Sequence, residues 1–162
     1  MIYNQIFEIL LFMAKISPII YIIIPSINYI NDSKDITSLT FIKGYLVSEA
    51  INKILKYSLQ MPRPDNAGNC SLIDKSSIFP KSFGMPSGHS QSAWYTSIFS
   101  SLYILNNKSY TKWKKMIYIF GITAINTFIS YSRVHIHCHS TTQIIIGGII
   151  GSLIGRATYK SR

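Results

Sequence analysis

Cysteine, valine and acidic residues are all scarce in this chain of 162 residues. Two cysteines, Cys70 and Cys138, are too few for a disulfide scaffold. We do not expect them to bond to each other, although the topology below places both on one side of a membrane. Valine occurs twice and isoleucine 31 times. This skew indicates a biased codon supply rather than a demand for β-strands, so the isoleucine runs are interpreted by their length, as helices.

Charge is also sparse and has one dominant sign. Charged residues make up 14% of the chain, with 16 lysines and arginines against six acidic residues. This excess does not indicate nucleic acid as a partner, because the lysines lie at the ends of apolar blocks rather than along one soluble face. A cleavable signal is not expected either, since residues 6–30 are too long for its apolar region and lack a small-residue cleavage site.

The apolar blocks predict the fold class. The length predicts one domain, 1–162, with a motif-bearing core at 39–158. Five segments have roughly the length that crosses a hydrocarbon core: 5–30, 39–59, 88–105, 115–131 and 141–158. We therefore expect an all-α, polytopic transmembrane bundle of about five spans. Pro18 and Pro25 predict a kink in the first segment, whose freed carbonyls neighbouring groups can satisfy.

The links between the segments predict the orientation. With five spans, the 60–87 and 132–140 links fall on one face, and most of the remaining lysines and arginines fall on the other. The positive-inside rule makes the lysine-rich face cytoplasmic and the two links luminal or external.

Two helix faces carry further patterns. Gly147, Gly151 and Gly155 follow a four-residue spacing that predicts a flat strip for close helix packing. Glu49 and Lys53 are also four residues apart, which predicts an ion pair.

Three short motifs meet on the non-cytoplasmic face. The first is Lys56 followed after six residues by Arg63 and a proline, and the second is the Pro-Ser-Gly-His run that ends at His89. In the third, Arg133 follows a serine and precedes His139 by six positions. The set suits phosphoryl transfer to water, because fixed Lys and Arg donors stabilise the charge that spreads over the equatorial oxygens.

The remaining groups divide the chemistry. The predicted phosphate ligands are Lys56, Arg63, Ser87, Gly88 and Arg133. One neutral histidine can attack phosphorus, and the other can protonate the departing oxygen and then activate water. The scheme needs no metal and no cofactor. A zinc site at His135, His137 and His139 is the weaker interpretation, because alternating positions aim their side chains inconsistently.

The three motifs resemble the signature of the type 2 phosphatidic acid phosphatase superfamily, K-x6-R-P, P-S-G-H and S-R-x5-H. The resemblance runs from Lys56 to about Gly148. It implies that His139 is the nucleophile, His89 the general acid, and Arg133 a catalytic and phosphate-binding residue. Many members have six spans, so one span is missing ahead of the second segment.

Flanking residues are similar to the dolichyl diphosphatase branch, which shares Gly-Met-Pro-Ser at 84–87 and His-Ser-Gln at 89–91. That branch has Gln where many members have an Asp that orients the nucleophile, and here the residue is Gln143. A Gln carbonyl accepts the imidazole N–H but does not stabilise imidazolium by charge. The resemblance implies a membrane lipid substrate and an endoplasmic reticulum membrane.

Four readings stay open at the level of the sequence. The first hypothesis is a polyprenyl diphosphate phosphatase, and the second is a broader lipid monophosphate phosphatase. A catalytically inactive lipid-binding protein is third, although every motif position is filled. A vanadium haloperoxidase has the same anion pocket but is expected in a larger soluble protein. Oligomeric state and lipid chain length are not determined by these patterns.

Overall fold

The regular secondary structure in the described residues consists of helices joined by links. The computed structural model describes residues 2–67, Cys70 and 83–162. Its helices are α1 (Ile2–Asn31), α2 (Ile36–Leu59), α3 (Gly88–Asn106), α4 (Lys112–His135) and α5 (Thr141–Lys160). The all-α prediction is confirmed, and each predicted segment lies within one of these helices.

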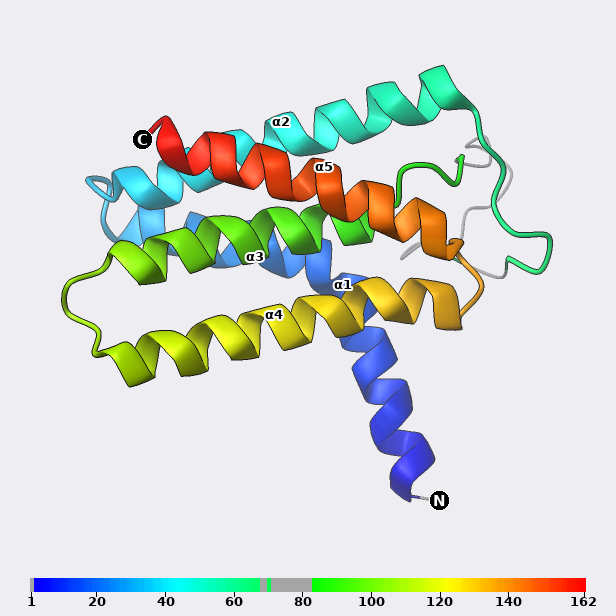
Figure 1. Ribbon diagram of the computed structural model, residues 1–162, viewed down its shortest axis with the longest axis horizontal. Coiled ribbons are helices and arrows are strands. Elements are labelled where there is room, and N and C mark those ends of the chain that lie inside the picture. The colour runs from blue at the N-terminus through cyan, green and yellow to red at the C-terminus, as the bar shows by residue number, and fades with distance from the viewer. Residues whose placement is uncertain (1, 68–69, 71–82) are drawn as a thin grey trace.

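The helices α2 to α5 begin at polar side chains that cap them. The caps are Asp35, Ser87, Thr111 and Ser140, and each accepts a hydrogen bond from a backbone N–H of the first turn. Such caps satisfy donors that have no partner inside the helix, which explains why the elements start where they do. Figure 1 shows that four helix ends lie at the same end of the bundle: the end of α2, the start of α3, the end of α4 and the start of α5. The two motif-bearing links therefore share one face.

The glycine strip of α5 brings it against α3. A Cβ at Gly147 would meet the Ser87 carbonyl, and a Cβ at Gly151 would meet the Gln91 carbonyl. One turn further on, Gly155 faces the Tyr95 carbonyl in the same way. The contacts repeat every four residues on both helices, so the packing role predicted for the strip is confirmed. This contact fixes the start of α3, which carries the Pro-Ser-Gly-His motif, relative to α5.

The first helix bends. Pro18 supplies no N–H to the Ala14 carbonyl, and the Ser17 hydroxyl donates to that carbonyl at 2.9 Å instead. The Tyr45 hydroxyl of α2 donates to the Pro18 carbonyl at 2.9 Å. In Figure 1 the N-terminal part of α1 leaves the bundle and its remainder runs along it. The kink expected from the prolines is present, and side chains satisfy the carbonyls around Pro18.

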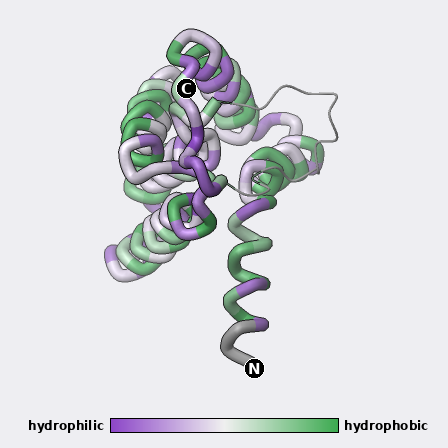
Figure 2. Tube along the Cα trace, turned by 90° about the vertical axis from the view of Figure 1, so that its right-hand side faces the viewer, coloured by the Kyte–Doolittle hydropathy of each residue, from purple (hydrophilic) through white to green (hydrophobic). Residues whose placement is uncertain are grey.

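The outer surface of the bundle is rich in apolar side chains. Examples of large exposed residues come from every helix, such as Phe12, Val47, Leu105, Phe120 and Leu153. Figure 2 shows hydrophobic residues in the helices of the bundle and along the part of α1 that leaves it. By length and composition, one helix in the described ranges, α1 over Gln5–Asn31, is apolar enough to cross a membrane. The number of spans stays a prediction.

The interior between α2 and α3 is polar. Asn52 donates to Gln91 Oε1 at 2.8 Å, and Gln91 in turn donates to the Ser48 carbonyl at 2.7 Å. Glu49 accepts a hydrogen bond of 2.6 Å from Ser92. The prediction of an ion pair between Glu49 and Lys53 is wrong, since none joins these two described residues. The Glu49 carboxylate instead accepts a hydrogen bond from Ser92 on α3, and Lys53 is exposed.

Candidate active site

A cavity of about 480 Å³ lies at the motif-bearing end of the bundle. Its walls include six of the eight residues predicted for the site: Lys56, Arg63, Gly88, His89, Arg133 and His139. They come from α2, the link after it, α3, α4 and the link between α4 and α5. The structure thus brings together residues that are as far apart as 83 positions, since Lys56 and His139 face one space.

The hydrogen bonds of His139 fix which ring nitrogen carries the proton. Its Nδ1 lies 3.2 Å from Oε1 of Gln143, which only accepts. Its Nε2 lies 3.5 Å from Nη1 of Arg63, which only donates. The proton therefore belongs on Nδ1, and the lone pair, through which the ring would attack an electrophile, is on Nε2 and faces Arg63.

Electrostatics keep the His139 ring neutral. Burial, together with the positive charges of Arg63 and Lys56, lowers the pKa of His139 to about 3. The hydrogen bond to Gln143 opposes this shift without reversing it. A neutral imidazole is the nucleophilic form, so His139 is competent for attack at physiological pH.

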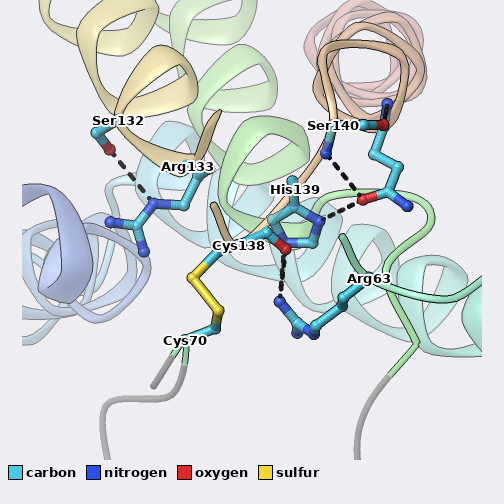
Figure 3. The surroundings of a disulfide bond; sticks show 8 residues. Arg63, Cys70, Ser132, Arg133, Cys138, His139 and Ser140 are labelled. Carbon is cyan, nitrogen blue, oxygen red and sulfur yellow. Dashed lines mark hydrogen bonds between the residues drawn. A yellow bond between two sulfur atoms is a disulfide. The ribbon is translucent and has the colours of Figure 1, made fainter. Parts of the chain in front are cut away.

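The side chain of Arg133 is 1% exposed, yet the two terminal nitrogens of its guanidinium lack hydrogen-bond partners among the described residues. Its Nε lies 3.3 Å from the Ser132 hydroxyl oxygen, as Figure 3 shows. An unpartnered buried guanidinium is costly, because the charge has lost its water without gaining acceptors. A planar two-donor fork on the wall of this cavity fits a phosphoryl group.

The turn after α4 explains the spacing between Arg133 and His139. The Arg133 carbonyl accepts from the backbone N–H groups of Cys138 and His139, at 2.9 and 3.1 Å. His137, with φ of 56°, takes the left-handed position that ends a helix in this type of cap. The turn therefore holds the guanidinium and the imidazole at a fixed separation.

The remaining predicted ligands occupy different positions. Lys56 donates from Nζ to the Phe83 carbonyl at 2.8 Å, which holds the ammonium at the cavity wall. Gly88 lines the cavity, and a Cβ there would come within 3.3 Å of Asn52 Oδ1. Ser87 is fully buried as the cap of α3 and is not part of the cavity wall. Its role as a phosphate ligand stays a prediction.

His89 projects from the first turn of α3 toward α1. Its Nε2 lies 3.0 Å from the Lys15 carbonyl oxygen. Because a carbonyl only accepts, this nitrogen carries a proton. The two histidines of the cavity thus hold their protons on opposite ring nitrogens.

The two cysteines form a disulfide, so the expectation that they stay unpaired is wrong. Cys70 and Cys138 are 68 positions apart in the sequence, with Cα atoms 5.5 Å apart. The Cys138 carbonyl also accepts from Nη1 of Arg63 at 3.0 Å. Figure 3 shows the bond directly beside Arg63 and His139. The number of cysteines alone does not predict this disulfide. The bond depends on Cys70 and Cys138 coming together beside the cavity, which only the fold determines.

Two structural features of the site were missed. Ser140 and Gln143 form a capping box at the start of α5, so Gln143 Oε1 accepts from both the Ser140 N–H and His139. The Ser-x-x-Gln pattern is a signal for this. Gln143 also donates to the Pro62 carbonyl at 2.8 Å. A Cβ at Gly84 would lie 2.6 Å from Gln143 Nε2, which explains the glycine there.

His135 and His137 do not join His139. The ring of His135 packs edge-on against Phe7 at 5.2 Å between centroids. Within the described ranges, no three His, Cys, Asp or Glu side chains lie together as metal ligands would.

Comparison with known proteins places the chain in a family. The model of the PAP2 superfamily matches residues 37–162. The chain belongs to the PAP2 superfamily. The PAP2 match includes every residue of the cavity except Pro18 of α1.

Individual PAP2 relatives agree with this assignment. Dolichyldiphosphatase 1 of Homo sapiens is 28% identical over 158 residues, which cover 93% of this chain and 63% of the human protein. Dolichyldiphosphatase of Saccharomyces cerevisiae is 31% identical over 118 residues, covering 69% of this chain and 46% of the yeast protein. Lipid phosphate phosphatase gamma of Arabidopsis thaliana is 23% identical and covers 78% and 54%. The chain thus spans less than two thirds of the length of these curated relatives.

The fold has a solved counterpart. A transmembrane PAP2-type phosphatidylglycerolphosphate phosphatase from Bacillus subtilis superposes with a TM-score of 0.76 at 21% identity, covering 98% of this chain and 76% of that protein. The five described helices therefore share the fold of that protein.

Proposed function

We propose that this protein is a lipid phosphatase that removes the terminal phosphate of a polyprenyl diphosphate of the dolichyl type. The observation that carries the proposal is the buried Arg133 guanidinium, whose terminal nitrogens lack partners in the described chain, on a cavity that it shares with His139. Membership of the PAP2 superfamily and the two dolichyldiphosphatase relatives support the substrate class.

The reaction has two steps. Nε2 of His139 attacks the terminal phosphorus, the bond from that phosphorus to the bridging oxygen breaks, and His89 gives a proton to the departing lipid monophosphate. Water then attacks the phosphohistidine, His89 takes a proton from the water, and the P–N bond breaks to release phosphate. Lys56, Arg63 and Arg133 stabilise the equatorial oxygens, and the backbone of Gly88 and the Ser87 hydroxyl complete the predicted set of ligands. Protein groups and water supply every step of this scheme, so we propose that no metal is required.

The proposed topology puts the site on the non-cytoplasmic face of a multi-pass membrane protein. The positive-inside distribution supports it. The Cys70–Cys138 disulfide beside the cavity supports it independently, because disulfides persist in oxidising compartments. Resemblance to the dolichyl diphosphatases favours the endoplasmic reticulum membrane.

A substrate comparison tests the proposal. Phosphate release by the detergent-purified protein is measured in a metal chelator with dolichyl diphosphate, dolichyl monophosphate and phosphatidate. We expect the diphosphate to be preferred, with activity retained in the chelator. Activity on phosphatidate alone would favour the broader monophosphate phosphatase, for which the Arabidopsis relative is the supporting observation. Inactivity on all three would leave a lipid-binding protein.

A further inference from the structure

The first helix contacts the active site although it lies outside the region that the family model matches, residues 37–162. The contact is the 3.0 Å hydrogen bond between Nε2 of His89 and the Lys15 carbonyl. Pro18, three residues further along α1, forms part of the cavity wall. The catalytic end of α3 therefore docks against the bend of α1.

Pro18 explains why the Lys15 carbonyl of α1 can accept a hydrogen bond from another helix. A proline inside a helix removes one N–H donor and pushes the carbonyl four residues earlier away from its ring, which opens the turn. Here that carbonyl is Ala14, and the Ser17 hydroxyl satisfies it at 2.9 Å. The next carbonyl in the same opened turn is Lys15, and it accepts from His89.

The neighbouring helix anchors the same bend from another side. Tyr45 of α2 donates its hydroxyl to the Pro18 carbonyl at 2.9 Å. Ala14 and Ser17 are 2% and 3% exposed, so the turn is packed inside the bundle. The bend is thus held in place by α2 and presents a fixed acceptor to α3.

A fixed acceptor determines the proton positions on His89. While Nε2–H donates to Lys15, the second ring nitrogen, Nδ1, is the atom that gains or loses a proton. Lys56, Arg63 and Arg133 line the same cavity as His89, and each of them only donates hydrogen bonds. The hydrogen bond to Lys15 therefore orients the ring with Nδ1 as its reactive atom.

We propose that the Pro18 bend of α1 is a positioning element of the active site, in which the Lys15 carbonyl holds the His89 ring and keeps a proton on Nε2. The ring is neutral in the free protein and takes up a second proton, at Nδ1, when the anionic substrate binds. In the first step this Nδ1–H gives its proton to the departing oxygen, and the ring becomes neutral again with Nε2–H retained. In the second step, Nδ1 takes a proton from the attacking water. This assignment deepens the proposed function and rests on it for the role of His89.

The test measures two quantities separately: the tautomer of the His89 ring and the kinetics of phosphate release. Protein labelled with ¹⁵N-histidine is purified in detergent, the His89 signals are assigned with His89→Gln, and the ring tautomer is read from its ¹⁵N shifts. We expect the Nε2–H tautomer in the unmodified chain. Pro18→Ala should lose the fixed tautomer and lower kcat about tenfold with little change in KM, because an acid–base group loses its orientation but phosphate binding does not. Pro25→Ala, which alters the second proline of the same helix away from the site, should change neither reading.

Three outcomes separate the two proposals. An Nδ1–H tautomer of His89 in the unmodified chain would overturn the positioning role, and this measurement needs no variant to fold. A Pro18→Ala variant with unchanged kcat and tautomer, in a protein that hydrolyses lipid diphosphate, would also overturn it and leave the proposed function standing. The third outcome is that the unmodified chain has the Nε2–H tautomer, that Pro18→Ala abolishes it, and that the protein hydrolyses no lipid phosphate. This result would support the hydrogen bond between His89 and Lys15 and would contradict the proposed function.

Discussion

His139 donates its Nδ1–H to the side-chain carbonyl of Gln143, four residues later, at 3.2 Å. The same amide donates to the Pro62 carbonyl and closes the capping box of α5. The His139 ring is thus oriented by a neutral group that is itself held at two other points. This arrangement fixes the geometry of His139 without adding a negative charge beside it.

Replacing that amide with a carboxylate changes the charge and keeps the shape. In Gln143→Glu, the carboxylate stabilises the imidazolium and raises the pKa of His139 from its present value of about 3. Because the proposed mechanism requires the neutral ring, the acid limb of kcat/KM should move to higher pH. The measurement is the pH profile of phosphate release for the two proteins. An acid limb at the same pH in both would contradict the assignment of Gln143 as the partner of Nδ1.

Arg133→Lys should be severely impaired. A lysine keeps the charge but not the planar pair of donors, so stabilisation of the transition state is lost. The expected fall in kcat is roughly 10²–10³-fold, the size seen when one donor to a developing charge is removed. Steady-state kinetics and a thermal unfolding curve on the same preparation measure it. A rate near that of the unmodified chain would mean that the phosphoryl group binds elsewhere.

The Cys70–Cys138 bond should stabilise the protein. It closes a separation of 68 positions and ties the first motif-bearing link to the turn next to His139. Removing it with Cys70→Ser and Cys138→Ser together should cost about 2–4 kcal/mol of unfolding free energy. Thermal unfolding with and without a thiol reductant is the measurement. Reductant should lower the Tm of the unmodified chain and leave the double variant unchanged; equal sensitivity would contradict the bond.

His137→Gly should raise stability and preserve activity. His137 has φ of 56°, a conformation that costs a side chain roughly 1–2 kcal/mol and costs glycine very little. The measurement is Tm together with phosphate release. Loss of activity at unchanged or raised Tm would show that His137 takes part in the chemistry rather than in the turn.

The strip between α3 and α5 offers a matched pair of glycines. A Cβ at Gly151 would overlap the main chain of Gln91, whereas a Cβ at Gly121 would meet nothing within 4 Å. Gly151→Ala should therefore be strongly destabilising, and Gly121→Ala should be neutral or stabilising by up to about 1 kcal/mol. Urea or thermal unfolding of both variants checks this. Equal effects at the two positions would contradict the close packing.

Local patterns predicted much of this molecule. The apolar segments located the helices because burial and length leave few alternatives, and the four-residue glycine spacing located the α3–α5 contact. The motif residues were expected to converge, and six of them line one cavity. The capping box at Ser140 was missed, although its Ser-x-x-Gln spacing is a signal for it.

Contacts between distant segments were not readable in the same way. Three contacts depend on how two links or two helices meet in space. They are the Cys70–Cys138 disulfide, the hydrogen bond from Ser92 to Glu49, and the hydrogen bond from His89 to the Lys15 carbonyl. Main-chain carbonyls have no signature in a sequence, so the role of α1 at the site emerges only from the fold. Ser87 illustrates a related limit, because the same hydroxyl suits both a phosphate ligand and a helix cap.

The most direct test of the central claim is to look for the phosphoryl group on His139. A dolichyl diphosphate labelled in its terminal phosphate is mixed with the unmodified chain and with His139→Ala, and both reactions are quenched rapidly under alkaline conditions, where phosphohistidine survives. The account predicts label on His139 in the unmodified chain, and neither label nor phosphate release in the variant. Turnover by His139→Ala at the unmodified rate, or label on another residue, would contradict it.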